Sequence, residues 1–444
     1  MDKEGIIKKD FETVWHPFTQ MKELEEDKPI VIEKGEGIYL YDIDSNRYID
    51  AVSSWWVNTL GHCNPKINKA LINQVQKLEH CMFAGFTHEN AVKLASELVE
   101  LTDNAFTKVF YSDNGSTAVE VALKMAYQYQ SQTGRAEKTK FVALKNSYHG
   151  DTLGAVSVGG VDLYHKVYKP IIFDVLQAQS PSCYRCPCSE TPETCHEECF
   201  ESMRNIIEEN HASISSVIME PLIQAAGGMI IYKKEYLEKL REVCDKYEII
   251  LIFDEVAVGF GRTGKLFAYQ HTKVVPDIIC LAKGITAGYM PLSVTLTNDK
   301  IYNAFYDDYE KNKTFYHGHS YTANALACAV AVENLRILKE DKVLESLDSK
   351  IEKFKTELAK LKDLEFVGDV RQLGMICAVE LVEDKISKTP LGHDKMKRFY
   401  KNALKYGAIL RPLGNVVYYL TPYIITDEQI EELCEITRKA ILEI

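Results

Sequence analysis

Short apolar runs alternate with amphipathic stretches along most of the chain. The apolar runs are typical of buried strands, and they occupy residues 108–112, 140–145, 216–220, 249–253, 277–281 and 292–297. The amphipathic stretches have helical spacing, and they occupy residues 65–79, 90–102, 116–130, 199–210 and 233–246. Buried strands that alternate with helices predict an α/β fold with a mostly parallel sheet flanked by helices.

The two ends of the chain have a different pattern. Residues 30–50 alternate β-branched and aromatic residues with turn residues, which predicts a meander of short strands. After about residue 320 the pattern predicts a smaller α+β unit of helices and strands. We expect its helices at 323–340, 343–362 and 393–406, strands within 367–382, and a strand pair near 408–421.

The overall composition excludes some classes of function. The formal net charge of −12 argues against a general nucleic-acid or membrane-surface partner, because no broad basic face is available. No apolar run approaches the roughly 20 residues that a bilayer span needs, and the N-terminus lacks the apolar stretch of a signal peptide. We therefore expect a cytoplasmic protein.

Five of the twelve cysteines lie close together, between Cys183 and Cys199. Cys183 and Cys186 have the spacing of metal ligands, but a second well-spaced pair is missing. A peripheral loop with reduced thiols is the alternative that a reducing compartment favours. We predict no catalytic metal.

Acidic and basic residues follow two of the predicted buried strands. Asp254 and Glu255 end the run "IILIF", and Lys283 follows "DIICL", with Gly284 and Gly288 beside it. The carboxyl ends of parallel strands form the edge at which ligands bind in open α/β sheets. A lysine there, beside residues small enough to let a ligand approach, is a candidate for covalent attachment to a carbonyl compound.

Two further features at strand ends complete a pattern typical of pyridoxal phosphate enzymes. The stretch "DNGSTAVEV" starts a helix at Gly115–Ser116, and its free backbone N–H groups suit a phosphate. Tyr148 follows the strand at 140–145 and offers an aromatic plane. The cofactor also needs a lysine for its aldehyde and a carboxylate for its ring nitrogen, and Lys283 and Asp254 fit these needs. Pyridoxal 5'-phosphate is therefore the predicted cofactor.

Three motifs strengthen this prediction: "DEVAVGFGRTG", "LAKGITAGYMPLS" and "HGHSYTANALACAVA". In order and spacing they resemble the signatures of the class III (ω-) aminotransferases, and the resemblance extends over nearly the whole chain. It implies a fold type I pyridoxal phosphate transferase, with an N-terminal segment (1–55) that packs with the small domain. It further implies a large cofactor-binding domain (56–325) and a small C-terminal domain (326–444).

Other stretches narrow the resemblance to a biotin-pathway branch of that family. They are "WHPFTQMKE", "SSWW", "YHGDTLGAVSV" and "RPLGNVVYYLTPYI". This branch transfers an amino group to 8-amino-7-oxononanoate (KAPA) and yields 7,8-diaminononanoate (DAPA). Its members use S-adenosylmethionine or lysine as amino donor. Phe18 stands where many members that use S-adenosylmethionine have Tyr, so the donor stays open, with S-adenosylmethionine the default.

The resemblance also implies roles for individual residues. Lys283 would be the catalytic lysine, Asp254 the partner of the ring nitrogen and Tyr148 a catalytic neighbour of the ring. Cofactor contacts are implied for Gly115, Ser116, Tyr148, Asp254, Lys283, His319 and Ser320. His319 and Ser320 would reach the phosphate of a neighbouring subunit, which implies a homodimer. Substrate contacts are implied for Phe18, Trp55, Trp56, Tyr148, Asp151, Arg262, Gly318 and Arg411. Arg411 would bind the far carboxylate of KAPA.

Two alternatives remain at this point. One is another ω-aminotransferase, acting on a diamine, ornithine or a β-amino acid. The other is a cysteine–metal protein on a catalytically silent transaminase fold. Purely structural interpretations also exist: Arg262 could stabilise a loop, and Trp55 and Trp56 could belong to the hydrophobic core. We interpret His149 as a structural hydrogen bonder.

Overall fold

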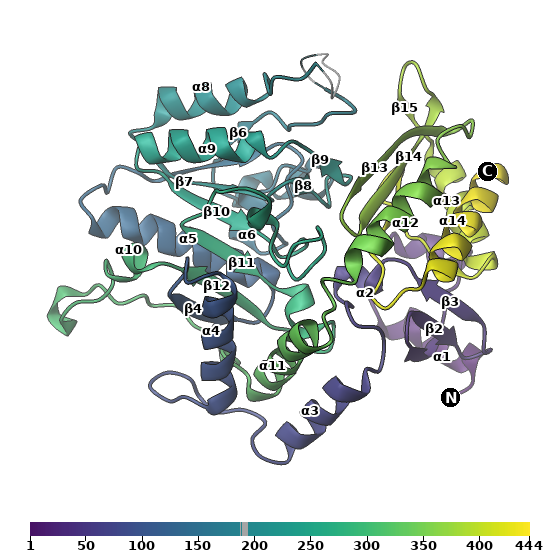
Figure 1. The fold of residues 1–444 in the computed structure, drawn as a ribbon, viewed down its shortest axis with the longest axis horizontal. Helices are drawn as coiled ribbons and strands as arrows, with labels where there is room; N and C mark the ends of the chain where they lie inside the picture. The colour runs from purple at the N-terminus through teal and green to yellow at the C-terminus, as the bar shows by residue number, and fades with distance from the viewer. Residues whose placement is uncertain (187, 189–193) are drawn as a thin grey trace.

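A seven-stranded sheet forms the centre of the molecule (Figure 1). The computed structural model describes residues 1–186, 188 and 194–444. The strand order is β4-β12-β11-β10-β7-β5-β6, and β12 alone runs against its two neighbours. The strands are β4 (Lys108–Ser112), β5 (Lys140–Leu144), β6 (Leu176–Ala178), β7 (Ile214–Met219), β10 (Ile250–Asp254), β11 (Ile278–Leu281) and β12 (Ser293–Thr297). The predicted mostly parallel α/β sheet is confirmed.

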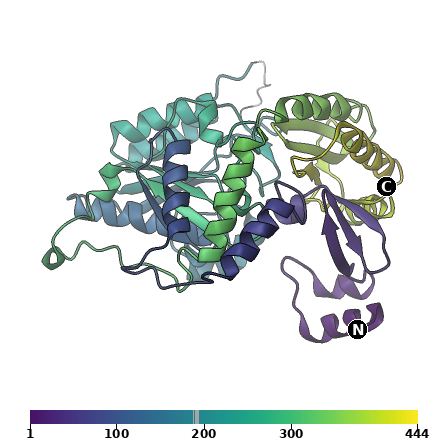
Figure 2. The same cartoon turned by 60° about the horizontal axis from the view of Figure 1, so that its bottom comes forward.

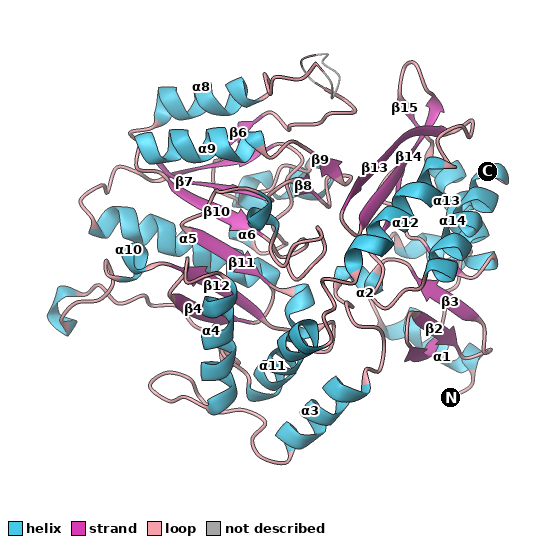
Figure 3. Ribbon diagram, in the orientation of Figure 1, coloured by secondary structure: helices cyan, strands magenta, loops and turns pink. Residues whose placement is uncertain are grey.

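Both faces of this sheet are covered by helices (Figure 3). Alternate residues of β10 face opposite sides: Ile250 and Ile252 pack in the core under α5, whereas Leu251 and Phe253 belong to the larger core on the other face. This alternation buries every residue of β10 and explains its continuous apolar run. The helices of the two layers are α3 (Pro65–Val75), α4 (Glu89–Leu101), α5 (Gly115–Gln132), α6 (Leu153–Ser157), α7 (Asp162–His165), α8 (Phe200–Asn210), α9 (Glu235–Lys246), α10 (Asp299–Tyr302) and α11 (Ala325–Glu340).

The C-terminal part builds a second, smaller sheet. Strand β14 (Ile376–Asp384) pairs with β13 (Val367–Leu373), β15 (Thr389–Pro390) and β17 (Val416–Tyr419), all antiparallel. Its helices are α12 (Leu347–Ala359), α13 (His393–Lys405) and α14 (Asp427–Leu442). The last of these was not among the predicted helices, although a Thr426 capping box opens it.

The N-terminal meander is completed by the far end of the chain. Strands β1 (Ile32–Glu36), β2 (Tyr39–Asp42) and β3 (Arg47–Asp50) form an antiparallel sheet, and β16 (Ala408–Ile409) adds to β3 in parallel. Figure 2 shows this meander, with α1 (Lys3–Thr13), beside the C-terminal part. The predicted strand pair near 408–421 is therefore wrong, because β16 pairs with β3 and β17 pairs with β14.

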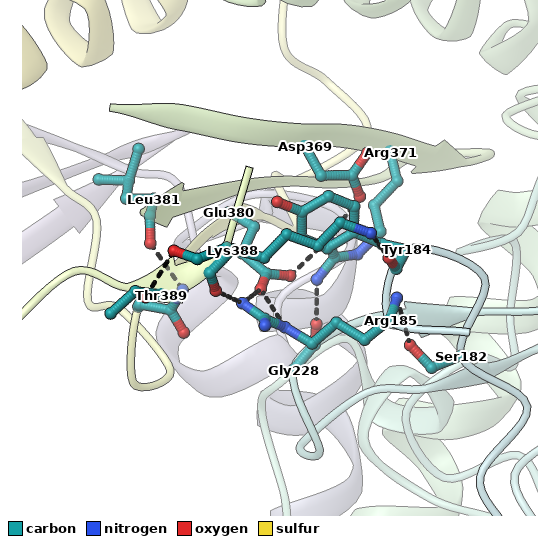
Figure 4. Close-up of polar contacts among 12 residues, drawn as sticks. Ser182, Tyr184, Arg185, Gly228, Asp369, Arg371, Glu380, Leu381, Lys388 and Thr389 are labelled. Carbon is teal, nitrogen blue, oxygen red and sulfur yellow. Dashed lines mark hydrogen bonds and ion pairs between the residues drawn. The ribbon is translucent and has the colours of Figure 1, made fainter. Parts of the chain in front are cut away.

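The excursion that follows β6 is tied to the small sheet by a partly buried cluster of charges (Figure 4). Glu380 of β14 accepts hydrogen bonds from Arg185 Nη2 (2.7 Å) and Arg371 Nη1 (2.9 Å). Arg371 also donates to the carbonyls of Gly228 and Met229, beside the short ribbon of β8 (Ile223–Gln224) and β9 (Ile230–Ile231). We refer to Arg185, Arg371 and Glu380 as the clasp, since they join three distant segments.

Two negative findings apply to the described part of the chain. Among those residues, no group of three or more His, Cys, Asp or Glu side chains could hold a metal ion. The same residues include no helix that is long and apolar enough to cross a membrane. Part of the cysteine-rich stretch, residues 187 and 189–193, lies outside them.

Candidate active site

A cavity of about 1110 Å³ opens at the carboxyl ends of the parallel strands. It is lined by residues that directly follow β4, β5, β7, β10 and β11, where an open α/β sheet binds its ligands. The N-terminal segment and the small domain close the rest of the wall. The predicted site residues that line it are Phe18, Trp55, Trp56, Gly115, Ser116, Tyr148, Asp151, Asp254, Lys283 and Arg411.

Lys283 starts a 3₁₀ turn (Lys283–Thr286) immediately after β11, with a φ of +47°. Its Nζ atom lies 4.2 Å from the centre of the Trp56 ring. Loss of water around the amine lowers the pKa of Lys283 to about 8, although Asp254 and Glu220 act to raise it. A substantial fraction of the amine is therefore neutral near physiological pH, which a nucleophilic lysine requires.

Asp254 ends β10, and two donors fix its carboxylate. Its Oδ2 atom lies 2.7 Å from Nδ1 of His149, and its Oδ1 atom accepts the Val256 N–H at 3.0 Å. His149 is buried, lines the cavity and has no hydrogen-bond partner at Nε2 within the described residues. The hydrogen bond of His149 thus holds Asp254 in place.

Glu220 is a cavity residue that the sequence-based prediction missed. It follows β7, and its carboxyl oxygens accept the N–H groups of Tyr148 (3.1 Å) and Ala225 (2.8 Å). Burial raises its pKa to about 7. The signal was present, since Glu220 follows an apolar strand just as Asp254 ends one.

The first turn of α5 faces the same cavity as Lys283. Asn114 caps the helix by accepting the Thr117 N–H at 3.1 Å, which leaves the N–H groups of Gly115 and Ser116 without partners inside the helix. A Cβ atom on Gly115 would lie 2.6 Å from Val256, so the close approach here requires glycine. The predicted anion-binding helix start therefore lies where a phosphate could bind.

Aromatic rings and one guanidinium form the outer wall of the cavity. The ring of Phe18 makes edge contacts with Trp55 and Tyr164, and the Arg411 guanidinium lies 5.2 Å from the centre of the Trp55 ring. Arg411 also donates to the carbonyl of Phe18 at 2.8 Å. Nearer the strand ends, Tyr148 donates its hydroxyl to Asp151 at 2.8 Å.

Four predicted site residues do not line this cavity. Arg262 is buried, and its guanidinium donates to the carbonyls of Thr421, Trp56 and Asn58. All of these partners are backbone atoms of the chain itself, and the substrate contact of Arg262 stays a prediction. Gly318, His319 and Ser320 also lie outside the lining, with His319 Nδ1 3.1 Å from Asp113 Oδ2.

The residues in the cavity fit pyridoxal phosphate. Lys283 supplies a partly neutral amine, Asp254 a fixed carboxylate, and the start of α5 a cradle of N–H groups for a phosphate. All three lie in one cavity, whose outer wall adds Arg411 for a second, anionic group. Such a site can accept a carboxylate-bearing molecule and transfer a group at the lysine end.

Comparison with known proteins agrees with this geometry. The family description "Aminotransferase class-III" matches residues 21–441. The "adenosylmethionine-8-amino-7-oxononanoate aminotransferase" of Geobacter sulfurreducens is 48% identical over 431 residues, which cover 96% of this chain and 95% of the relative. The protein of the same name from Methanocaldococcus jannaschii is 44% identical, and the match covers 100% of this chain and 99% of the relative.

Solved structures show the same similarity. The crystal structure of the M. jannaschii protein superposes with a TM-score of 0.95 at 43% identity and covers 100% of this chain and 99% of that one. An ω-transaminase from Pseudomonas jessenii in complex with PMP superposes with a TM-score of 0.93 at 31% identity, covering 98% and 97% of the two chains.

Proposed function

The chain belongs to the class III aminotransferases, and on that premise we propose that it is the biotin-pathway enzyme that converts KAPA to DAPA. Its cofactor is pyridoxal 5'-phosphate. One observation carries the choice of substrate: the rings of the sequence neighbours Trp56 and Trp55 lie near an amine, Lys283, and a guanidinium, Arg411, respectively. A ketone that carries a distant carboxylate, as KAPA does, suits this arrangement.

Each residue has a defined task in this proposal. When bound, pyridoxal phosphate supplies an electron sink that stabilises negative charge on the neighbouring carbon. Lys283 Nζ takes a proton from the amino-bearing carbon of the donor, and in the second half-reaction it returns a proton to the former keto carbon of KAPA. Asp254, held by His149, keeps the ring nitrogen protonated.

The outer wall orients the substrate and excludes water. Arg411 would bind the KAPA carboxylate through paired N–H groups, while the indole rings cover the reacting carbon. Phe18 lies at this wall with 45% of its surface exposed, and it contacts Trp55. We propose S-adenosylmethionine as the donor, with lysine as the second candidate, because Phe18 lacks the hydroxyl that many users of S-adenosylmethionine have there.

A half-reaction panel tests the function and the donor. The holoenzyme is mixed separately with S-adenosylmethionine, lysine, ornithine and a diamine, and the visible absorbance of the cofactor is followed. We expect bleaching with S-adenosylmethionine, and recovery when KAPA, but not 2-oxoglutarate, is then added. Recovery with 2-oxoglutarate alone would support an ω-aminotransferase of another specificity.

The variant Lys283→Ala serves as the control for this panel. It should retain the cofactor non-covalently, because Asp254 and the start of α5 are unchanged, and it should lose turnover. Substantial residual transamination in Lys283→Ala would remove the proposed role of the lysine.

The assembly we propose is a homodimer in the cytoplasm, in which His319 and Ser320 complete the phosphate site of the partner subunit. Two observations support this role: neither residue lines the cavity of its own chain, and His319 lies beside Asp113, which does. We also propose that residues 1–55 pack with the C-terminal part, which the pairing of β3 with β16 supports. The predicted boundary between residues 325 and 326 would move to the end of α11, because α11 packs against α3 and α4 of the large domain.

A further inference from the structure

The four residues of α2 (Ser53–Trp56) form a left-handed turn. Their φ angles are +48°, +47°, +75° and +75°, and none of them is glycine. L-residues avoid this region because Cβ approaches the next carbonyl oxygen, and they occupy it singly rather than in runs. Four in succession are a source of backbone strain, and strain of this kind persists where surrounding contacts force it.

Asp50 holds the start of this turn. It is 1% exposed, and its carboxylate accepts the Ser54 N–H at 2.9 Å and the Ser54 hydroxyl at 2.7 Å. Its Oδ2 atom also lies 3.0 Å from Nε2 of His62. The Ser53 hydroxyl, fully buried, donates to the carbonyl of Leu420. Both hydroxyls and the Ser54 N–H therefore have fixed partners.

Arg262 holds the end of the turn. Its Nη2 atom donates to the carbonyls of Trp56 (3.3 Å) and Asn58 (3.0 Å), and its Nη1 atom donates to Thr421 at 2.7 Å. Arg262 is 1% exposed, and burial lowers the pKa of its guanidinium. This geometry gives Arg262 a task other than the predicted contact with substrate.

The held turn directs two indole rings into the cavity. Trp56 covers Lys283, and its Nε1 atom donates to the Tyr418 hydroxyl at 3.1 Å. Trp55 lies against Phe18 and the Arg411 guanidinium. Sequence neighbours thereby contact both ends of the proposed substrate site, one near the reacting amine and one near the carboxylate-binding group.

We propose that the left-handed turn is a strained positioning device for Trp55 and Trp56, with Asp50 and Arg262 as its positioning residues. Its effect on substrate selection rests on the proposed function, whereas the strain itself does not. If the turn relaxed, both rings would leave the wall between Lys283 and Arg411, and KAPA would bind less well while the chemistry at Lys283 continued.

The strain is tested by comparing Ser54→Gly with Ser54→Ala. Both variants lose the hydroxyl and keep the N–H. Because Ser54 is exposed, the methyl group of alanine adds little packing, and the cost of the left-handed backbone is weighed against the greater freedom of glycine in the unfolded chain. We expect Ser54→Gly to melt about 2 °C above Ser54→Ala in thermal unfolding of the cofactor-free protein.

The matched control is Ser349, an exposed residue inside α12 whose hydroxyl also bonds to a carbonyl. There the order should reverse, since glycine destabilises an ordinary helix. If the melting temperature of Ser54→Gly is equal to or lower than that of Ser54→Ala, the turn is not strained.

The positioning role is tested with Asp50→Ala and with the double variant Asp50→Ala/Ser54→Gly. We expect Asp50→Ala to raise KM for KAPA about 10-fold with kcat nearly unchanged, and to alter the near-ultraviolet circular dichroism of the tryptophans. Ser54→Gly should restore part of both signals in the double variant, because it makes the same backbone easier to adopt. The role would be overturned if Asp50→Ala lowered kcat as much as kcat/KM and left the tryptophan spectrum unchanged. It would also be overturned if Ser54→Gly restored neither KM nor the spectrum in the double variant.

These measurements distinguish a failure of the strained turn from a failure of the proposed function. If the unaltered enzyme fails to aminate KAPA, the proposed function fails, but the melting order and the tryptophan spectra still decide whether the turn is strained and held by Asp50.

Discussion

Lys283 shares the cavity with two carboxyl groups of different character. Asp254 is fixed by His149 and a backbone N–H, whereas burial raises the pKa of Glu220 to about 7. Glu220 is therefore partly neutral at physiological pH, and its charge changes in the same range as that of Lys283. The amine responds to pH through its own titration and through that of its neighbour.

The lowered pKa of Lys283 predicts a characteristic pH dependence of cofactor capture. Only the neutral amine reacts with an aldehyde, so the capture rate should rise roughly 5-fold from pH 7 to 8 and less than 2-fold from pH 8 to 9, as a pKa of about 8 requires. The measurement is stopped-flow absorbance of the cofactor-free protein mixed with pyridoxal phosphate. A rise of about 10-fold for each unit through pH 9.5 would contradict the prediction, since it describes an ordinary lysine.

Glu220→Gln checks the cause of this shift. The ionised Glu220 raises the pKa of Lys283, so its removal should move the plateau of capture to lower pH. Asp151→Asn is a suitable comparison, because Asp151 also lines the cavity but is not among the groups that shift Lys283. A profile that is unchanged in Glu220→Gln would exclude the coupling.

At the scale of elements, local pattern predicted six of the seven strands of the central sheet, because a buried strand has a mostly apolar sequence. It missed the edge strand β6, which has only three residues and is not fully buried. The same rule predicted where Asp254, Lys283 and the start of α5 lie. Each follows or ends a strand, and the carboxyl ends of parallel strands lie at one edge of the sheet. The pairing of β16 was not predictable in this way: two nearby apolar runs favour a hairpin, whereas β16 pairs with a strand from the other end of the chain.

The left-handed turn and the task of Arg262 were also beyond the sequence. Left-handed backbone is normally marked by glycine, and "SSWW" has none. Arg262 lies in a family-matched loop near the site, but only the folded chain shows that its donors end on the carbonyls of Trp56, Asn58 and Thr421. Both features depend on contacts between segments far apart in sequence.

The clasp yields a prediction about how elements are held together. Arg371→Leu should lower the free energy of unfolding by about 3 kcal/mol, because Arg371 is largely buried and its loss leaves Glu380 and two carbonyls short of donors. Arg185→Leu should cost about 1 kcal/mol, since Arg185 is 39% exposed and Glu380 keeps Arg371. Urea unfolding measures both.

The exposed pair of Lys395 and Glu383 is the control for the clasp. Lys395→Met should leave the urea midpoint unchanged, because exposed ion pairs contribute little. An Arg371→Leu variant as stable as Lys395→Met would show that the clasp does not hold the small sheet in place.

At the scale of the whole molecule, the cavity is built from segments spread over the full length of the chain. Phe18, Lys283 and Arg411 line it together, although almost 400 residues separate the first from the last. No single part of the chain contains the site. The proposed dimer extends this principle, because it adds His319 and Ser320 from a second copy.

Complementation between subunits tests that extension. Lys283→Ala and a His319→Ala/Ser320→Gly variant should each be nearly inactive, because each lacks one half of the composite site. The two variants are mixed in equal amounts by refolding or co-expression. Half of the dimers are then mixed, and each mixed dimer has one intact site of two. The mixture should therefore recover roughly a quarter of the unaltered activity. Recovery no greater than the sum of the two separate variants would exclude a shared site.

The parallel pairing of β3 with β16 has a consequence for biosynthesis. Ile49 emerges from the ribosome roughly 360 residues before its partner Ala408. At about 5–20 residues per second, the outer edge of β3 stays without its neighbour for roughly 20–70 s. An open strand edge is a template for pairing with other chains. The nascent chain is therefore open to aggregation at its N-terminal meander, and a chaperone that binds near the N-terminus would protect it for the whole interval.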